Sequence, residues 1–240
     1  MNEHLPTWIT LGAQVRYRGE GTEEGSPYLL ERYRVSLGIQ PLPWMGFFGE
    51  FQDARAVNLP VQGAGIRDEA DIRQAYVRIG QEGGWWDVKA GRQKMAFGSE
   101  RVIGAGEWGN TARVFDAVRL GIHHKNDRVD IFSSSVVVNN SKDLDHHMDG
   151  DNLHGVYGSF SSWLKGSKIE PYLLLRANHR FSNSTNWTYG LRAAGAAGPK
   201  WNYEAEALGE RGHLRGSELR LGAGWCRCRG TFGTSGWHRP

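Results

Sequence analysis

Positively charged side chains recur at every second position of several short segments, where they alternate with apolar residues. Arg16 and Arg18 flank Tyr17, and Arg32 and Arg34 follow the same pattern. Because successive side chains of a β-strand point to opposite faces, this spacing places the arginines of each segment on one face. A wall of fixed cations attracts an anionic solute, and weak contacts at several positions let it leave again. The candidate wall residues are Arg16, Arg32, Arg34, Arg78, Lys89, Arg119, Arg176 and Arg192, interrupted by the acidic Glu50, Asp87, Glu204 and Glu206.

A turn at residues 81–84, QEGG, sets the expected register between two of these segments. It places Arg78 opposite Asp87 and Tyr76 opposite Lys89, with all four side chains on the polar face. Cross-strand pairs of this kind contribute about 0.2–1 kcal/mol each. Their larger role would be to hold charged groups at fixed positions on the wall, although arginine and glutamate could also simply satisfy one another.

The best metal candidate in the sequence is DLDHHMDGDNLH, residues 143–154. It resembles a calcium-binding loop only partly, because Gly150 fits the pattern but Val156 stands where a bidentate glutamate is required. We therefore expect a solvated polar loop, no metal ion and no other cofactor. The side chains at alternate positions that could bind a cation are Asp145, His147, Asp149 and Asp151.

Paired carboxylates that could hydrolyse a glycoside occur as Glu100 with Glu107 and as Glu204 with Glu206, but nothing else marks a sugar-cleaving cleft. The nucleophile, phosphate-binding and zinc-protease motifs G-x-S-x-G, G-x-x-x-x-G-K-[ST] and H-E-x-x-H are absent from the sequence. The sequence therefore predicts no enzymatic activity.

Composition narrows the class of protein. A formal net charge of +3 over 240 residues is too small to indicate nucleic-acid binding. Mean hydropathy is −0.54 and no run of 18 apolar residues occurs, which excludes helical membrane spans but leaves a transmembrane barrel open. No secretory signal is visible at the N-terminus, which taken alone would favour the cytoplasm. The C-x-C pair, Cys226 and Cys228, suits neither a zinc site nor an unstrained disulfide.

Period-two alternation recurs about every 20 residues and predicts an all-β fold of about eleven strands, each long enough to cross a bilayer when tilted. Short connections alternate with long ones, which is typical of an antiparallel transmembrane β-barrel and distinguishes it from a soluble sandwich. An odd strand number indicates a partial barrel. The predicted strands lie at 9–18, 32–40, 47–53, 74–79, 86–93, 115–123, 128–137, 152–160, 168–177, 186–194 and 201–210.

Tryptophan and the C-terminal segment complete this interpretation. Six tryptophans fall on the side of the short connections, where an aromatic girdle at one membrane interface would lie: Trp8, Trp44, Trp85, Trp86, Trp163 and Trp201. Alternation fades after residue 212, where Arg, Gly and Cys crowd together. We expect residues 1–212 to form one partial barrel domain and residues 213–240 to be an irregular tail, either poorly ordered or translated out of frame.

The run GRQKMAFGSERVIGAGEWGNTARVFDAVRL, residues 91–120, resembles the alginate-export family of bacterial outer-membrane porins. Supporting matches are ITLGAQVRYRGE, FFGEFQDAR, ADIRQAYVRIG, SSSVVV and GDNLHGVYGS, in that order along residues 8–212. The resemblance implies a barrel of about eighteen antiparallel strands, of which this chain would hold somewhat over half. It also implies an arginine-rich lumen that passes an anionic polysaccharide.

Residues 101–120 are interpreted as the end of an extracellular loop that runs into a descending strand. Arg101 and Arg113 are expected at the mouth of the channel, in a loop that enters it, and Arg119 is expected on the wall. Arg73 and Arg92 are in phase with the apolar face, so they either meet lipopolysaccharide phosphates or turn inward past a β-bulge. The place of Arg92 in the GRQ run favours the inward position.

The expected function is passive passage of an anionic saccharide, such as a polyuronate, or of a related small anion through the bacterial outer membrane. The expected partners are that solute, outer-membrane lipid and lipopolysaccharide, with no nucleic acid. The alternative is a soluble β-rich carbohydrate-binding or lyase-like protein that uses its Trp and Arg side chains on a saccharide. Membrane fractionation of the full-length gene product separates the two.

Overall fold

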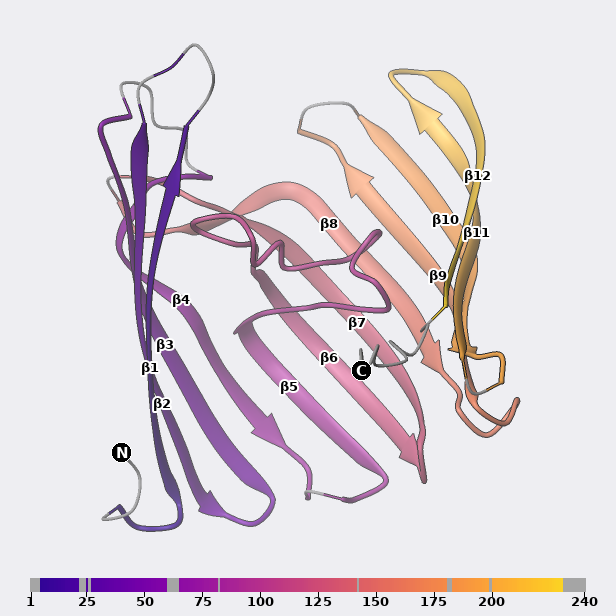
Figure 1. The fold of residues 1–240 in the computed structure, drawn as a ribbon, viewed down its shortest axis with the longest axis horizontal. Helices are drawn as coiled ribbons and strands as arrows, with labels where there is room; N and C mark the ends of the chain where they lie inside the picture. Colours follow the sequence, from indigo (N-terminus) through magenta and orange to yellow (C-terminus); the bar gives the residue numbers. More distant parts are fainter. Residues whose placement is uncertain are drawn as a thin grey trace, which may run out of the picture.

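The computed structural model describes residues 5–230 apart from residues 22–24, 26, 60–64, 82, 142, 181–182 and 199. Within these residues, 12 antiparallel strands form one sheet, ordered as they occur along the chain (Figure 1). No helix in the described part is long and apolar enough to cross a membrane. The strands are β1 (Ile9–Glu20), β2 (Tyr28–Leu42), β3 (Met45–Val57), β4 (Asp68–Ile79), β5 (Trp86–Gln93), β6 (Phe115–His124), β7 (Asp127–Val138), β8 (His146–Ser159), β9 (Ser167–Asn178), β10 (Ser184–Ala196), β11 (Trp201–Leu214) and β12 (Ser217–Gly230).

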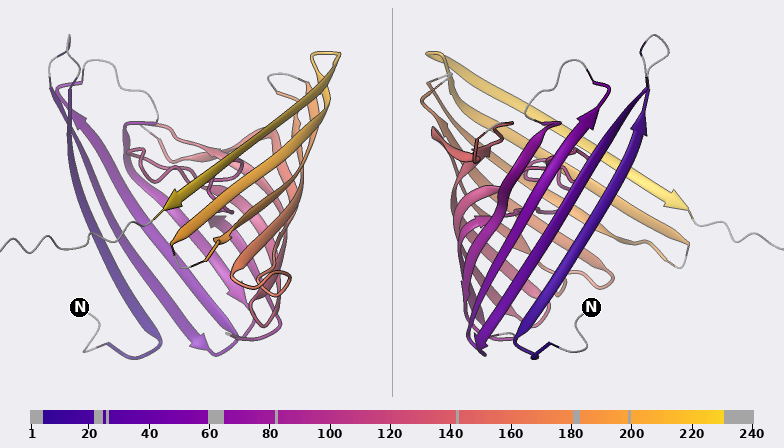
Figure 2. Two further views of the ribbon diagram at one scale, coloured as in Figure 1. Left: turned by 45° about the vertical axis from the view of Figure 1, so that its right-hand side comes forward. Right: turned by 90° about the vertical axis from the view of Figure 1, so that its left-hand side faces the viewer.

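The sheet curves into an open trough with β1 and β12 at its two edges (Figures 1 and 2). The predicted all-β, antiparallel class is confirmed, and the eleven predicted strands correspond to β1–β11. Connections after β2, β4, β6, β8 and β10 define the turn side, and those after β1, β3, β5, β7 and β9 define the loop side. The six tryptophans of the predicted girdle all lie at or next to connections on the turn side.

A twelfth strand occupies residues that the sequence analysis assigns to an irregular tail. Strand β12 pairs with β11 from Leu214↔Ser217 to Trp201↔Gly230. The sequence prediction is wrong here because β12 does not separate apolar from charged positions: Leu221 shares a face with Arg227. A two-residue turn at 215–216, with both residues at positive φ, makes the hairpin. The remaining tail residues, 231–240, lie outside the described residues.

The two faces of the trough differ sharply in chemistry. The convex face exposes apolar side chains such as Val15, Val35 and Leu191, which are 50–60% exposed. The concave face carries charge: Arg32 and Arg34 are only 3% and 6% exposed because other polar groups cover them. This division follows the period-two alternation, since residues next to each other in a strand point to opposite faces.

One strand pairing differs from the predicted one, and another decides between the two positions left open for Arg73. Arg78 pairs with Lys89 in register, so the predicted pairing of Arg78 with Asp87 is wrong. The last pair before the turn is Ile79↔Val88, so the turn is wider than QEGG. The register between β4 and β5 is therefore shifted by two residues from the predicted one, and each side chain stays on the face predicted for it. On β4 a register shift opposite Glu50 and Phe51 makes a β-bulge that turns Arg73 inward. Of the two alternatives for Arg73, the structure therefore has the inward one.

The long β5–β6 connection, residues 94–114, lies against the concave face of the sheet instead of projecting from its rim (Figures 1 and 2). Its apolar residues form the main hydrophobic cluster with the wall: Met95 and Ile103 are buried against Phe132, Tyr157 and other side chains of β6–β9. Gly98 takes a positive φ of 56°, and a Cβ there would lie 2.6 Å from the hydroxyl of Tyr157. Glycine therefore permits both the backbone turn and the close approach to the wall.

Candidate functional site: a charged trough crossed by a loop

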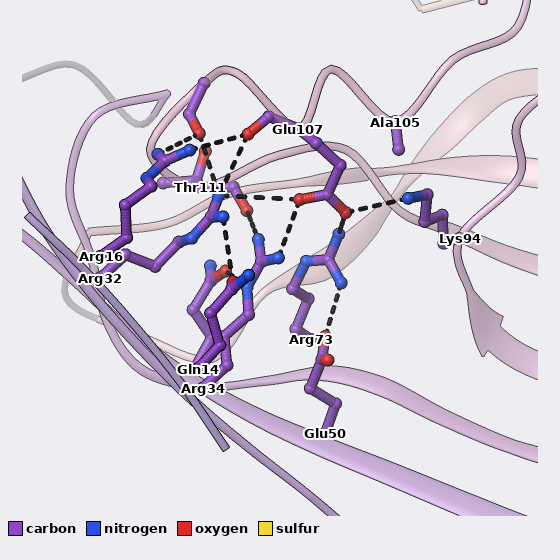
Figure 3. A network of polar contacts seen from close by, with 12 residues as sticks. Gln14, Arg16, Arg32, Arg34, Glu50, Arg73, Lys94, Ala105, Glu107 and Thr111 are labelled. Atoms are coloured by element: carbon purple, nitrogen blue, oxygen red, sulfur yellow. Dashed lines mark hydrogen bonds and ion pairs between the residues drawn. The ribbon is translucent and has the colours of Figure 1, made fainter. Parts of the chain in front are cut away.

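Glu107, near the middle of the 94–114 connection, lies within a cluster of cations from β1, β2 and β4 (Figure 3). Its carboxylate accepts hydrogen bonds from Arg34 Nη1 at 2.8 Å and Arg73 Nη2 at 2.6 Å. Lys94 Nζ lies 3.2 Å away, and Arg73 also donates to Glu50 at 2.5 Å. One carboxylate of the loop thus bridges two arginines of the wall, Arg34 and Arg73.

The backbone of the loop is held by further arginines and by one asparagine. Arg16 donates to the carbonyl oxygens of Glu107 and Gly109 at 2.9 and 2.7 Å, and Arg32 donates to the same two carbonyls at 3.2 Å (Figure 3). Asn110, only 2% exposed, donates from Nδ2 to the carbonyls of residues 31, 55 and 66 at 2.9–3.1 Å. These contacts fix the position of the loop against β1–β3 and the β3–β4 connection.

The electrostatics of this cluster keep Glu107 ionised. Burial alone would raise the pKa of Glu107, but the hydrogen bond from Arg34 and the charges of Arg73, Arg34 and Lys94 outweigh burial and lower it to about 2. The anchor is therefore fully present above about pH 4.5, the ordinary value of a glutamate, and is lost only as the pH falls towards 2.

The other end of the loop is held by aromatic contacts. Phe97 stacks on Phe132 and Tyr157, with ring centroids 5.4 and 4.7 Å apart. The guanidinium of Arg101 lies 3.7 Å from the centre of the Trp225 ring on β12. The loop therefore spans the trough from the arginines of β1 and β2 to the far edge of the sheet, and it narrows the space above the concave face.

Three cations lie side by side on the concave face nearer the turn side. Arg78 of β4 pairs in register with Lys89 of β5, and Lys89 pairs in register with Arg119 of β6. They line a pocket of about 620 Å³ together with Arg128 of β7. Like charges directly opposite each other destabilise a sheet, so the row is unfavourable for folding and needs another explanation.

Nearby carboxylates offset only part of this charge. Asp130 lies 2.8 Å from Arg119 Nε and 2.7 Å from Arg128, and Asp87 contacts His123 and lies 3.3 Å from Arg128. Four cations against two carboxylates leave an excess of two positive charges without counting His123. Among the described residues, Arg78 and Lys89 form no ion pair.

The remaining candidates divide into neutralised and accessible residues. Arg176 pairs with Asp151 at 2.8 Å, and Arg192 pairs with Glu170 and Glu204. The charges of these two arginines are therefore balanced by carboxylates of the wall. Arg101 and Arg113, expected at the mouth, line a common pocket of about 530 Å³ on the loop.

Arg92, left between two positions by the sequence, contacts neighbouring loop-side groups. It hydrogen-bonds Asp116 at 2.9 Å and the carbonyl of Asp145 at 3.0 Å. Its register partners are Ala75 of β4 and Asp116 of β6. The side chain thus fills the loop end of β5, where the strand leaves the sheet.

The acidic residues that the sequence offers as its best metal candidate, though no metal ion is expected there, do not come together. Asp149 is 88% exposed and contacts only the exposed His147 among the described residues, and Asp151 is paired with Arg176. Asp145 instead lies beside Asp68 and Asp71 of β4. Asp145, Asp149 and Asp151 therefore do not form one cluster, because Asp149 and Asp151 continue along β8 while Asp145 precedes it.

Sequence reasoning missed two residues that position the loop. The sequence analysis treats Glu107 only as half of a catalytic pair with Glu100. In the structure its partners are Arg34 and Arg73, which are 73 and 34 positions away from it in the sequence. Asn110 carries no pattern of its own. Only the abundance of arginine at alternate wall positions, facing one acidic residue in a long loop, could have indicated the ion cluster.

The chain is similar to a known protein family and to a solved structure of low sequence identity. A family model described as alginate export matches residues 7–230. Among solved structures, the chain is similar to OmpTdeltaL8, a loop L8 deletion mutant of OmpT, an outer membrane protein of Vibrio cholerae. The TM-score is 0.43 and the sequence identity 10%, over 88% of this chain and 85% of that chain. A search of curated proteins gives no match.

Proposed function

This chain belongs to the alginate export family, and from that membership we propose that it forms the wall of an outer-membrane channel for anionic saccharides. The family match confirms the resemblance predicted from residues 91–120 and extends through β12. The proposed solute is a polyuronate such as alginate or a related anion, which moves passively along its gradient. No cofactor is needed for this process, because fixed charges on the wall act directly on the solute.

The observation that carries the proposal is the row of Arg78, Lys89 and Arg119 across three neighbouring strands. A structural role would favour opposite charges in such positions, because like charges opposite each other cost stability. A channel for a polyanion favours like charges, because successive carboxylates of the solute can exchange between neighbouring cations without binding tightly to one. The row is thus costly for the fold and useful for transport.

The apolar convex face supports placement of the sheet in a membrane. Large exposed apolar surfaces mark contact with lipid or with another protein. Here the exposed side chains lie on the alternate positions of many strands, including Val15, Val35, Phe51, Val118 and Leu191. Exposed tryptophans at the turn side, such as Trp44 and Trp163, fit an interfacial girdle.

The loop across the trough acts as the constriction. It carries its own cations, Arg101 and Arg113, and it is anchored by Glu107 to the arginines of the wall. Arg16, Arg32 and Arg34 therefore position the constriction, while Arg78, Lys89 and Arg119 contact the passing solute. Glu50 belongs to the anchor through Arg73.

Flux from liposomes tests the proposal. The full-length gene product is reconstituted into liposomes loaded with fluorescent oligouronates or with neutral maltooligosaccharides of the same length. We expect the oligouronates to leave faster than the neutral sugars, because the excess positive charge raises their concentration in the lumen. Equal rates for the two sugars, or no release of either, would contradict the proposed function.

A further inference from the structure

Three buried carboxylates meet at the loop end of β4, away from the cation row. Asp68 and Asp71 are each 1% exposed, and Asp145, the residue immediately before β8, is 7% exposed. Each offers one carboxylate oxygen, and the three oxygens lie within 4.8 Å of one another. The cluster thus joins residues about 75 positions apart in the sequence at one point of the fold.

The hydrogen bonds of the cluster hold these carboxylates in place but leave two of their oxygens without a donor. Asp68 Oδ2 accepts from Gln52 Nε2 at 2.9 Å, and Asp71 Oδ1 accepts from the backbone N–H of Asp145 at 3.0 Å. Asp68 Oδ1 and Asp71 Oδ2 are buried and receive no hydrogen bond from the described residues. A buried carboxylate oxygen without a partner is costly, so these two atoms point to a missing positive ligand.

Arg92 does not balance the charge of the cluster. Its guanidinium lies 3.8 Å from Asp71 Oδ2 but 2.9 Å from Asp116, with which it forms the closer pair. Among the described residues, three carboxylates therefore share part of one guanidinium. A buried negative charge without a cation beside it is unfavourable, and a cation bound between the three carboxylates would remove that cost.

We propose that Asp68, Asp71 and Asp145 bind a divalent cation, with Ca²⁺ the best fit. Ca²⁺ is a hard ion that takes oxygen ligands from carboxylates, carbonyls and water in flexible geometry. The free oxygens of Asp68 and Asp71 supply two ligands, and Asp145 supplies a third from another segment. Because neither unpaired oxygen takes part in anchoring Glu107, this site is separate from the constriction.

The cation would tie the β7–β8 connection to β4. Residues of this connection already touch the cluster: Asn140 donates its backbone N–H to Asp145 Oδ1 at 2.6 Å, and Asn139 approaches Asp68 Oδ2 at 3.5 Å. Binding that occurs only in the folded state stabilises it by mass action. We therefore expect the ion to protect the β7–β8 connection and to leave the cation row of the wall unchanged.

Calorimetry with CaCl₂ on the full-length gene product tests this site, in detergent micelles free of lipopolysaccharide and after treatment with EDTA. We expect one Ca²⁺ per chain with a Kd in the range of about 10⁻⁵–10⁻³ M, as in moderate-affinity and extracellular calcium sites. Asp71→Asn should raise the Kd at least about tenfold, because the number of charged ligands sets the affinity. Asp149→Asn removes the same charge from an exposed carboxylate on β8 and should leave the Kd unchanged.

A second measurement keeps the test decisive if Asp71→Asn fails to fold. Limited proteolysis of the wild-type protein with and without 5–10 times the Kd of Ca²⁺ should show slower cleavage within residues 139–145 in its presence. The proposal is overturned if calorimetry detects no binding, if Asp149→Asn weakens binding as much as Asp71→Asn, or if cleavage is the same with Ca²⁺ and with EDTA.

Discussion

Replacing Lys89 with methionine is expected to stabilise the folded protein and to reduce its preference for anions at the same time. Lys89 lies between Arg78 and Arg119 in register, so removing its charge relieves two unfavourable cross-strand contacts. The free energy of unfolding should rise by up to about 1 kcal/mol. Methionine keeps the unbranched, flexible shape of the side chain but ends one atom short of Lys89 Nζ, which lies 4.2 Å from the centre of the Tyr76 ring.

The loss of selectivity follows from the same charge. The interaction energy between a unit positive charge and an anion about 4 Å away in water is about 1 kcal/mol, which corresponds to roughly a fivefold change in the local anion concentration. The permeability ratio of chloride to potassium should therefore fall about two- to fivefold in Lys89→Met, allowing for screening by salt. Urea unfolding in detergent and zero-current potentials in planar bilayers measure the two effects on one preparation.

Lys165→Met is the matched control for Lys89→Met, because Lys165 is exposed on the β8–β9 turn and lies outside the row. It should change neither stability nor selectivity. A variant Lys89→Met that is less stable than the wild-type protein and equally selective would show that Lys89 has a structural role only.

Replacing Glu107 with glutamine is expected to release the constriction. The substitution leaves Arg34, Arg73 and Lys94 without the carboxylate that they share, and Glu50 alone cannot neutralise them. Breaking a fully buried ion pair costs roughly 3–5 kcal/mol. Glu107 is 33% exposed, so we expect a smaller local cost of at least about 1 kcal/mol.

Two observables should change together in Glu107→Gln. Single-channel conductance should rise because the loop no longer fills the trough, and the preference for anions should increase because the wall gains one net positive charge. In the wild-type channel the same opening should appear only in acid, as the pH falls from about 4.5 towards the pKa of about 2 that the arginines give Glu107. Glu107→Gln should lack this acid transition.

Glu218→Gln provides the control for charge. Its side chain is 61% exposed on β12 and pairs only with the exposed Arg220 among the described residues, so the substitution removes the same charge far from the loop. Equal conductance of the wild-type protein and Glu107→Gln would contradict the anchoring role of Glu107. An increase of the same size in Glu218→Gln would show that net charge alone is responsible.

The sequence predicts the sheet well because period-two alternation reports directly on which side chains face lipid and which face the concave side. The same pattern places Arg32, Arg78 and Arg119 on the concave face, as the structure has them. Strand β12 escaped detection because Leu221 and Arg227 share one of its faces, and alternation cannot identify a strand that mixes the two kinds of residue.

Register and loop contacts could not be read from the sequence. A shift of two residues between β4 and β5 preserves the faces, so alternation gives no signal that Arg78 meets Lys89 instead of Asp87. The bulge that turns Arg73 inward and the path of Glu107 across the trough depend on contacts between distant segments. The cluster of Asp68, Asp71 and Asp145 arises in the same way, from two segments that only the fold brings together.

The zero-current potential of the wild-type channel is the most direct test of the central claim, that the concave wall passes anions. The full-length gene product is inserted into a planar bilayer between KCl solutions of tenfold different concentration, with oligouronate then added to one side. We predict a potential of the sign that marks chloride as the more permeant ion, together with block of the current by the oligouronate. A potential that marks potassium as the more permeant ion, with no block by oligouronate, would contradict the account.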